Sequence, residues 1–214
     1  VRRGITDFDM LDRLHVMECC RNFHGLDLKA IAFPSYDGTA LVNVMYRSLD
    51  KQFQGEKDCE QIPWNIDSAL GEESLFITEG RMDALTLIQC GHGNTVSVPN
   101  GANFELGNLD RFRYSHFDPL KTVYLAVDTD IEGQKLCRSL SRYFGEHRCR
   151  LVEWEWPSDE GYETAKDANE CLQKGGMEAV EYSISHATEC PIEGEVRAES
   201  EFDRLDDLKC HGLP

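Results

Sequence analysis

Two short apolar runs in the middle of the chain each stop abruptly in acidic residues. Residues 75–77 are followed by Thr78, Glu79 and Gly80, and residues 123–127 are followed by Asp128-Thr129-Asp130. A continuous apolar run of this length is typical of a strand buried on both faces, and a helical pattern of apolar positions starts after each acidic segment. The pattern therefore predicts two strand-loop-helix units of an α/β sheet.

The same pattern predicts the remaining elements of the chain. Apolar positions three or four residues apart indicate helices, alternating or continuous β-branched runs indicate strands, and Asp37-Gly38 is typical of a hairpin turn. The expected elements are a short helix capped by Thr6 or Asp7, a hairpin over 30–48, a helix over 81–90, a strand over 95–98, a crossover helix through 136–144, a strand over 149–154 and a helix over 177–187.

These elements suggest three segments. We expect a small mixed α+β lobe at 1–69, with a break near Pro63, and an α/β domain at 70–174 with a mostly parallel sheet and flanking helices. A helical tail and an acidic linker are expected at 175–214.

The acidic residues at the two strand ends point to a metal site. The carboxyl ends of neighbouring parallel strands meet at one edge of a sheet, where such folds bind ligands. If the two strands are neighbours, Glu79 faces Asp128 and Asp130. Carboxylates gathered in this way repel one another unless a cation lies between them, and hard oxygen ligands favour Mg²⁺ or Mn²⁺.

Composition limits the possible partners. The net charge of −17 argues against extensive binding of nucleic acid, but residues 1–70 are nearly balanced, with 8 basic and 11 acidic groups. Nine scattered cysteines include no CxxC pair, which excludes a zinc ribbon and fits a reducing compartment. No apolar run approaches 18 residues, so no membrane segment is expected, and the chain lacks an initiating Met, which predicts a fragment.

Four motifs together resemble a known family. The TEG at 78–80, SVPNGA at 97–102, DTDIEGQK at 128–135 and KDANECL at 166–172 resemble the TOPRIM primase half of the bifunctional primase-helicases of phages and their organellar Twinkle-type relatives. The resemblance implies a TOPRIM fold and synthesis of short RNA primers on single-stranded DNA from NTPs. It also implies a covalently linked helicase, an upstream zinc-binding domain, and a location in the bacterial or phage-infected cytoplasm or in a eukaryotic organelle.

The resemblance also implies roles for individual residues. The metal ligands are Glu79, Asp128, Asp130 and Asp167, and Glu79 is in addition the candidate general base. Nucleotide and DNA binding is expected from Arg47, Lys51, Lys57 and Lys166. Supporting positions are Gly80, Asp83, Asn100, Gly101 and Asn169.

Several alternatives stay open at this point. Asp167 is equally well interpreted as a helix cap, and Asp83 as a first-turn acid favoured by the helix dipole. The same acids serve a metal-dependent nuclease, and a primase that has lost activity serves as a single-stranded-DNA-binding lobe. A topoisomerase needs a separate tyrosine domain, which we do not find. No G-x-x-x-x-G-K-[ST] motif is present, so the 214 residues themselves are not expected to form an NTP-driven motor.

Overall fold

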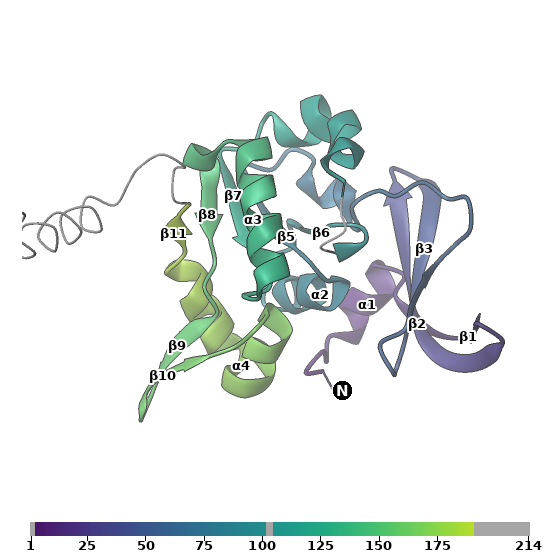
Figure 1. Ribbon diagram of the computed structural model, residues 1–214, viewed down its shortest axis with the longest axis horizontal. Helices are drawn as coiled ribbons and strands as arrows, with labels where there is room; N and C mark the ends of the chain where they lie inside the picture. The colour runs from purple at the N-terminus through teal and green to yellow at the C-terminus, as the bar shows by residue number, and fades with distance from the viewer. Residues whose placement is uncertain (1–2, 102–104, 191–214) are drawn as a thin grey trace, which may run out of the picture.

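The fold contains a five-stranded sheet, a four-stranded sheet and a two-stranded hairpin, together with helices and loops (Figure 1). The computed structural model describes residues 3–101 and 105–190. Ala102 of the predicted SVPNGA loop and the predicted acidic linker lie outside the described residues.

The larger sheet has the strand order β11-β8-β7-β5-β6. Its members are β5 (Ser74–Thr78), β6 (Thr95–Ser97), β7 (Thr122–Ala126), β8 (Cys149–Leu151) and β11 (Thr188–Glu189). The first four are parallel and β11 is antiparallel. Strands β5 and β7 are direct neighbours, with Thr78 opposite Ala126, which places their acidic ends side by side.

Helices cover both faces of this sheet. Helix α3 (Ile131–Phe144) packs on one face through Leu136, Leu140 and Phe144, against the side chains of Leu75 and other inward-facing positions of β5 and β7. Helices α2 (Arg81–Gln89) and α4 (Ala168–Ser185) cover the opposite face. Successive side chains of β5 and β7 point to opposite faces of the sheet. Because helices cover both faces, the residues on both faces are apolar.

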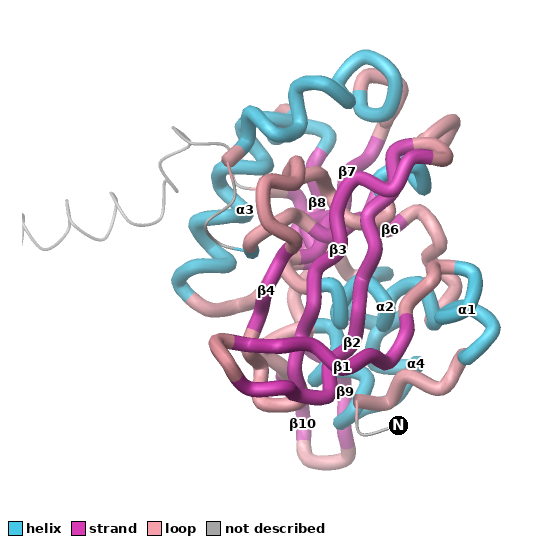
Figure 2. The backbone as a smooth tube through the Cα atoms, turned by 90° about the vertical axis from the view of Figure 1, so that its right-hand side faces the viewer, coloured by secondary structure: helices cyan, strands magenta, loops and turns pink. Residues whose placement is uncertain are grey.

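The smaller sheet forms the antiparallel lobe that Figure 2 shows in front of the parallel strands. Helix α1 (Phe8–Arg13), capped by Asp7, precedes it. The strands are β1 (Met17–Phe23), β2 (Leu26–Asp37), β3 (Ala40–Ser48) and β4 (Phe53–Gly55), in that spatial order. The predicted hairpin corresponds to β2 and β3, whereas β1 was not predicted.

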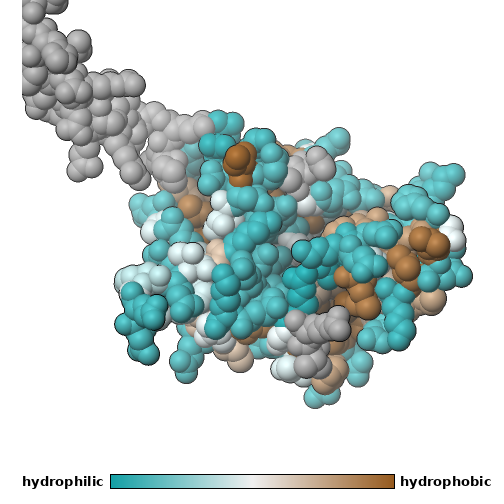
Figure 3. Space-filling view, turned by 60° about the horizontal axis from the view of Figure 1, so that its bottom comes forward, coloured by the Kyte–Doolittle hydropathy of each residue, from teal (hydrophilic) through white to brown (hydrophobic). Residues whose placement is uncertain are grey.

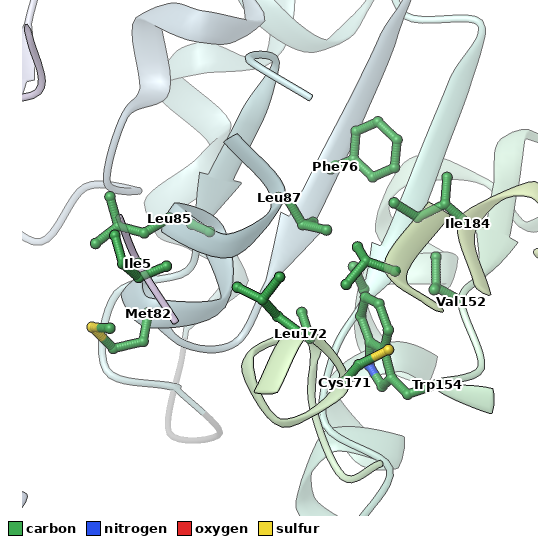
Figure 4. Close-up of a cluster of buried hydrophobic side chains, with 14 of the residues drawn as sticks. Ile5, Phe76, Met82, Leu85, Leu87, Val152, Trp154, Cys171, Leu172 and Ile184 are labelled. Atoms are coloured by element: carbon green, nitrogen blue, oxygen red, sulfur yellow. The ribbon is translucent and has the colours of Figure 1, made fainter. Parts of the chain in front are cut away.

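A shared hydrophobic core joins the lobe to helix α2. Phe33 of β2 contacts Trp64 edge to face with ring centroids 6.0 Å apart, and both belong to the same buried cluster as Met82 and Leu85 of α2. Figure 4 shows Ile5, Met82 and Leu85 together in this cluster. The packing fixes the beginning of α2 relative to the antiparallel lobe.

Helix α4 joins two expected helical segments, the run for which Asp167 is the candidate cap and the helix over 177–187. The expected helix over 177–187 is the second part of α4, which bends at Gly176, where φ is +73°. The preceding Gly175 packs against Trp156, because a Cβ there would lie 2.7 Å from the indole ring. The predicted domain limits at 69 and 174 stay a prediction.

The remaining elements are short. They are η1 (Ile66–Ala69), η3 (Leu106–Phe112), the π-helical turn η4 (Arg113–Phe117), η5 (Glu146–Arg148) and the hairpin of β9 (Glu155–Ser158) and β10 (Gly161–Thr164).

The surface is mainly hydrophilic in the view of Figure 3, and hydrophobic side chains gather at the antiparallel lobe on the right. Large exposed apolar residues of that lobe include Met17, Leu26 and Leu41. Within residues 3–101 and 105–190, no helix has the length and apolar character needed to cross a bilayer.

Candidate active site

A cavity of about 690 Å³ lies between the antiparallel lobe and the acidic edge of the parallel sheet. This volume is in the range of small-molecule sites. Its walls combine four carboxylates, four cations and apolar side chains. The lining residues are Arg3, Phe33, Met45, Arg47, Lys51, Phe53, Glu79, Gly80, Arg81, Met82, Asp83, Asn100, Gly101, Asp128 and Asp167.

Glu79 and the loop after β6 form one wall of the cavity. Glu79 follows β5 directly, and its backbone carbonyl accepts a hydrogen bond from Ser97 Oγ at 3.3 Å. Gly101 has φ of +54°, and a Cβ at this position would lie 3.4 Å from Glu79 Oε1. Asn100 also has a positive φ, of 60°. The predicted supporting loop therefore lies against the glutamate.

Lys166 joins the two aspartates of the DTD motif. Its Nζ lies 2.9 Å from Asp128 Oδ2 and 3.0 Å from Asp130 Oδ2. Asp130 also caps helix α3 by accepting from Gly133 N at 3.0 Å. The backbone bond from Gly133 and then the ammonium of Lys166 lower the pKa of Asp130, whereas burial raises the pKa of Asp128 despite the same lysine.

Asp83 is buried beneath the site and connects helix α2 to helix α4. Its Oδ1 accepts from Asn169 N at 3.1 Å, and Asn169 Nδ2 in turn donates to Thr86 Oγ1 at 2.9 Å. Gly80 is required for this arrangement, because a Cβ there would lie 2.5 Å from Asp83 Oδ2. Burial first, and then the charges of Asp167 and Asp128, raise the pKa of Asp83 well above its ordinary value.

Asp167 is the N-cap of helix α4, which agrees with its interpretation as a helix cap from the sequence. Its Oδ1 accepts from Glu170 N at 2.7 Å, and Glu170 Oε2 accepts from Lys166 N at 2.7 Å. Thr129 N donates to the carbonyl of Lys166 at 2.9 Å, which ties this loop to the DTD motif. The cap uses one carboxylate oxygen while the side chain lines the cavity, so the role as a metal ligand stays a prediction.

The basic residues predicted in the antiparallel lobe divide into two groups. Arg47 and Lys51 line the cavity, and the Arg47 guanidinium lies 5.7 Å from the centroid of the Phe53 ring. Lys57 is exposed and is not among the lining residues. Burial and then the charge of Arg3 lower the pKa of Arg47, which shows that two cations face one region of the cavity.

The carboxylates fit a hard divalent cation by donor type. Lys166 already places one positive charge between Asp128 and Asp130, where the sequence predicted a cation. Among the described residues, no three acidic, histidine or cysteine side chains converge as a ready metal-binding group. In this arrangement, Lys166 neutralises the carboxylates of Asp128 and Asp130.

Two arginines of the cavity were not predicted from the sequence. Arg3 donates from Nη1 to Asn169 Oδ1 at 3.3 Å, and Arg81 is the first residue of α2. The only available signal was that Arg81 directly follows the TEG motif. An arginine at the start of a helix is ordinarily exposed, and the partial burial of Arg81 is not visible in the sequence.

Comparison with known proteins identifies the larger domain. The Toprim-like family matches residues 76–172, the segment that carries Glu79, Asp128 and Asp167. Residues 76–172 form a Toprim-like domain. It is 31% identical over 189 residues to the Twinkle homolog protein, chloroplastic/mitochondrial, of Arabidopsis thaliana, covering 82% of this chain and 26% of that protein. It is also 31% identical over 175 residues to the primase homolog protein of Arabidopsis thaliana, covering 76% and 51%.

Solved structures agree with this TOPRIM assignment. The primase fragment of the bacteriophage T7 primase-helicase protein aligns with a TM-score of 0.69 and 20% identity, covering 86% of this chain and 71% of that chain. The E. coli primase catalytic core aligns with a TM-score of 0.59 and 17% identity, covering 87% and 71%. These likenesses show the fold. The TOPRIM chain spans about half or less of the length of its two plant relatives.

Asp83 and Asp130 are expected to give opposite pH dependences of stability in metal-free buffer. The pKa of Asp83 is raised in the folded state, so Asp83 favours the folded state most when its carboxyl is protonated. Its contribution to the unfolding free energy is complete below the unfolded-state pKa of about 3.9 and is lost as pH rises through the folded-state pKa. As pH rises from 5 to 8, we expect the unfolding free energy of Asp83→Asn to fall less than that of wild type. Urea unfolding at both pH values measures this difference.

Asp130→Asn is the matched control, because the pKa of Asp130 is lowered. Its contribution is present above about pH 4 and disappears as pH falls through the folded-state value. The control is therefore expected to leave the slope between pH 5 and pH 8 unchanged. Equal slopes for wild type and Asp83→Asn would show that Asp83 does not titrate as its burial indicates.

Proposed function

We propose that the chain is a primase core that makes short RNA primers on single-stranded DNA. The supporting observation is the cavity with carboxylates on its sheet edge and cations on its lobe side, within a TOPRIM domain of the primase type. Such a pair of walls suits a reaction between a polyphosphate and a hydroxyl group. In this reaction the 3′-OH of one ribonucleotide attacks the α-phosphate of an NTP, a phosphodiester bond forms, and pyrophosphate leaves.

The acidic wall supplies the groups nearest the chemistry. Mg²⁺ or Mn²⁺, when bound, would stabilise charge on the attacking and leaving oxygens. Asp128, Asp130 and Asp167 are the proposed ligands. Glu79 is the proposed further ligand or the acceptor of the 3′-OH proton, because it stands at the end of β5 on the cavity wall.

Lys166 has a proposed role in both halves of the site. Its ammonium now neutralises Asp128 and Asp130, and the pKa of Lys166 is raised by these two carboxylates. If Asp128 and Asp130 held a divalent ion, Lys166 would be available to bind a phosphate of the substrate. Asp83 and Asn169 act through position, because their hydrogen bonds hold α2 and α4 together under the site.

The basic wall is proposed to bind substrates. Arg47 and Lys51 reach the cavity from the antiparallel lobe, and Phe53 offers an exposed ring for a base. Lys57, which is exposed outside the cavity, is proposed to contact the DNA template. The net charge of −17 limits binding elsewhere on the surface.

Partners and location follow as proposals from the named relatives. The structural relative is a primase-helicase protein, which supports a covalently linked helicase, and the Twinkle homolog is named as a chloroplast and mitochondrial protein. We propose an organellar location for a eukaryotic source and a cytoplasmic one for a bacterial or phage source. An upstream zinc-binding domain is proposed for template recognition, and segments 1–69, 70–174 and 175–214 are the proposed units.

The test supplies a short RNA already annealed to a DNA template, so that template recognition is not required. We expect addition of one templated ribonucleotide when the matching NTP and Mg²⁺ or Mn²⁺ are present, and no addition of a mismatched NTP. Cleavage of the DNA instead would identify a metal-dependent nuclease. Binding of the template without extension in either metal would overturn the proposal in favour of a non-catalytic DNA-binding lobe.

A further inference from the structure

Arg81 is a half-buried cation without a protein partner in the described part of the chain. It is the first residue of α2 and lines the cavity. Its Nε is inaccessible to solvent and meets no hydrogen-bond acceptor among the described residues. Burial alone lowers the pKa of Arg81 to about 10. A guanidinium withdrawn from water in this way is costly unless an anion compensates its charge.

Other arginines of the structure show what a compensated guanidinium looks like. Arg21 Nη2 lies 3.0 Å from Glu56 Oε2. Arg111 forms ion pairs with Asp37 and Glu60. Arg148 donates to two backbone carbonyls, those of Phe144 and Leu120. Unlike these arginines, Arg81 has a solvent-inaccessible Nε that meets no acceptor among the described residues.

The acids of the same cavity have other partners. Asp128 pairs with Lys166, Asp83 accepts from Asn169 N, and Asp167 accepts from Glu170 N. None of these three acids is paired with Arg81, which lines the cavity as a separate positive group. A ligand that satisfies both sets must present negative oxygens to Arg81 and metal-compatible oxygens to the acids.

Further positive groups lie on the lobe side of the cavity. Arg47 and Arg3 line it, and their mutual repulsion contributes to the lowered pKa of Arg47. An anion bound between these two guanidinium groups would relieve their repulsion and accept charge-assisted hydrogen bonds from both. The first backbone amides of α2 add donors at the same place, because the N-cap residue Gly80 makes no side-chain cap.

We propose that Arg81 binds the triphosphate of the incoming nucleotide from inside the cavity, with Arg47 and Arg3 completing the anion site. The inference rests on the proposed primase function and assigns one part of its substrate to one residue. A triphosphate carries enough charge and enough oxygens to contact both the arginines and a divalent ion held by the acids. Arg81 then acts as a substrate-binding residue.

The test compares Arg81→Met and Arg81→Lys with Arg138→Met, which removes the same charge from an exposed position of α3. The probes are ATP, inorganic tripolyphosphate and adenosine, each titrated calorimetrically with Mg²⁺ present. We expect Arg81→Met to weaken ATP and tripolyphosphate binding about 10-fold to 100-fold, in line with the loss of charge-assisted hydrogen bonds. Adenosine binding should not change, Arg81→Lys should lose less, and Arg138→Met should behave as wild type.

Thermal unfolding separates a binding role from a structural one. Because Arg81 is uncompensated without ligand, Arg81→Met is expected to melt at or above the wild-type temperature, and ATP should raise that temperature less than in wild type. A lower melting temperature together with equal loss of ATP and adenosine binding would assign Arg81 to structure. Unchanged tripolyphosphate affinity, or weakened binding of single-stranded DNA alone, would also overturn the proposal.

The primer-extension assay distinguishes failure of this inference from failure of the proposed function. Wild-type protein that binds tripolyphosphate through Arg81 but adds no ribonucleotide would contradict the primase function and leave the anion site standing. Extension with an unchanged KM for the NTP in Arg81→Met would contradict the anion site and leave the primase function standing.

Discussion

Glu79→Gln is expected to lower templated ribonucleotide addition by about 100-fold to 10,000-fold, the range for removing a general acid or base. The substitution keeps the size of the side chain at the end of β5 and removes its negative charge and its ability to accept a proton. The fold should remain, because glutamine keeps the size of the side chain and the backbone carbonyl of Glu79 still accepts from Ser97 Oγ. Single-turnover extension of the annealed RNA measures the rate, and circular dichroism checks the fold.

Glu132→Gln is the matched control for this prediction. Glu132 lies in the first turn of α3 near the same edge of the sheet, is exposed, and pairs only across one turn with Lys135 at 2.7 Å. An exposed pair of this kind contributes little to stability. Extension by Glu132→Gln should therefore stay within about twofold of wild type. More than a tenth of the wild-type rate in Glu79→Gln would remove Glu79 from the chemical step.

The parallel sheet was predictable because its strands are buried on both faces. The continuous apolar runs at β5 and β7 are too short to form buried helices and are typical of central strands, and parallel neighbours bring their ends to one edge. Strand β1 was missed because most of its residues are only partly covered and include Arg21 and Asn22. Strand β10 has four exposed residues and gives no hydrophobic pattern. Such strands exist through pairing with a neighbour, which the sequence of a single strand does not reveal.

The acids of the site were predictable, but their individual environments were not. The sequence suggests that Asp128 and Asp130 repel each other as equals. In the structure, 15% of the Asp128 side chain is exposed and 46% of the Asp130 side chain, and the two pKa values move in opposite directions. Lys166 reaches both from a loop far along the chain. Burial and long-range pairing decide these differences, and both arise from tertiary structure.

The basic residues of the cavity were predicted from the sequence only in part. Arg47 and Lys51 line the cavity as the family resemblance suggested, whereas Lys57, only a short distance beyond Lys51 along the chain, lies outside the lining set. Arg81 was passed over because its local context is an ordinary helix start. Its partial burial at the cavity arises from tertiary structure. The sequence pattern and the family resemblance together named all the acids that line the cavity, but of its cations only Arg47 and Lys51.

Gly133→Ala is expected to destabilise the fold by about 2–3 kcal/mol, at the upper end of overpacking effects. A Cβ at Gly133 would lie 2.0 Å from the backbone carbonyl oxygen of Asp128 and 2.7 Å from its carbonyl carbon. No rotamer change relieves a clash with backbone, so either the first turn of α3 or the loop carrying Asp128 and Asp130 must shift. The hydrogen bond from Gly133 N to Asp130 Oδ1 belongs to the same turn.

Thermal unfolding of Gly133→Ala measures this effect as a fall of about 4–12 °C in the melting temperature, given the usual entropy of unfolding for a chain of this size. Gly107→Ala is the matched control, since a Cβ there meets nothing within 4 Å and its φ is not positive. It should melt within about 2 °C of wild type, as surface substitutions usually do. Because the displaced loop carries two proposed metal ligands, Gly133→Ala should also lose ribonucleotide addition below its melting temperature. Wild-type melting and wild-type extension together would mean that the close approach of α3 to Asp128 is dispensable, and with it the idea that this glycine positions the acidic wall.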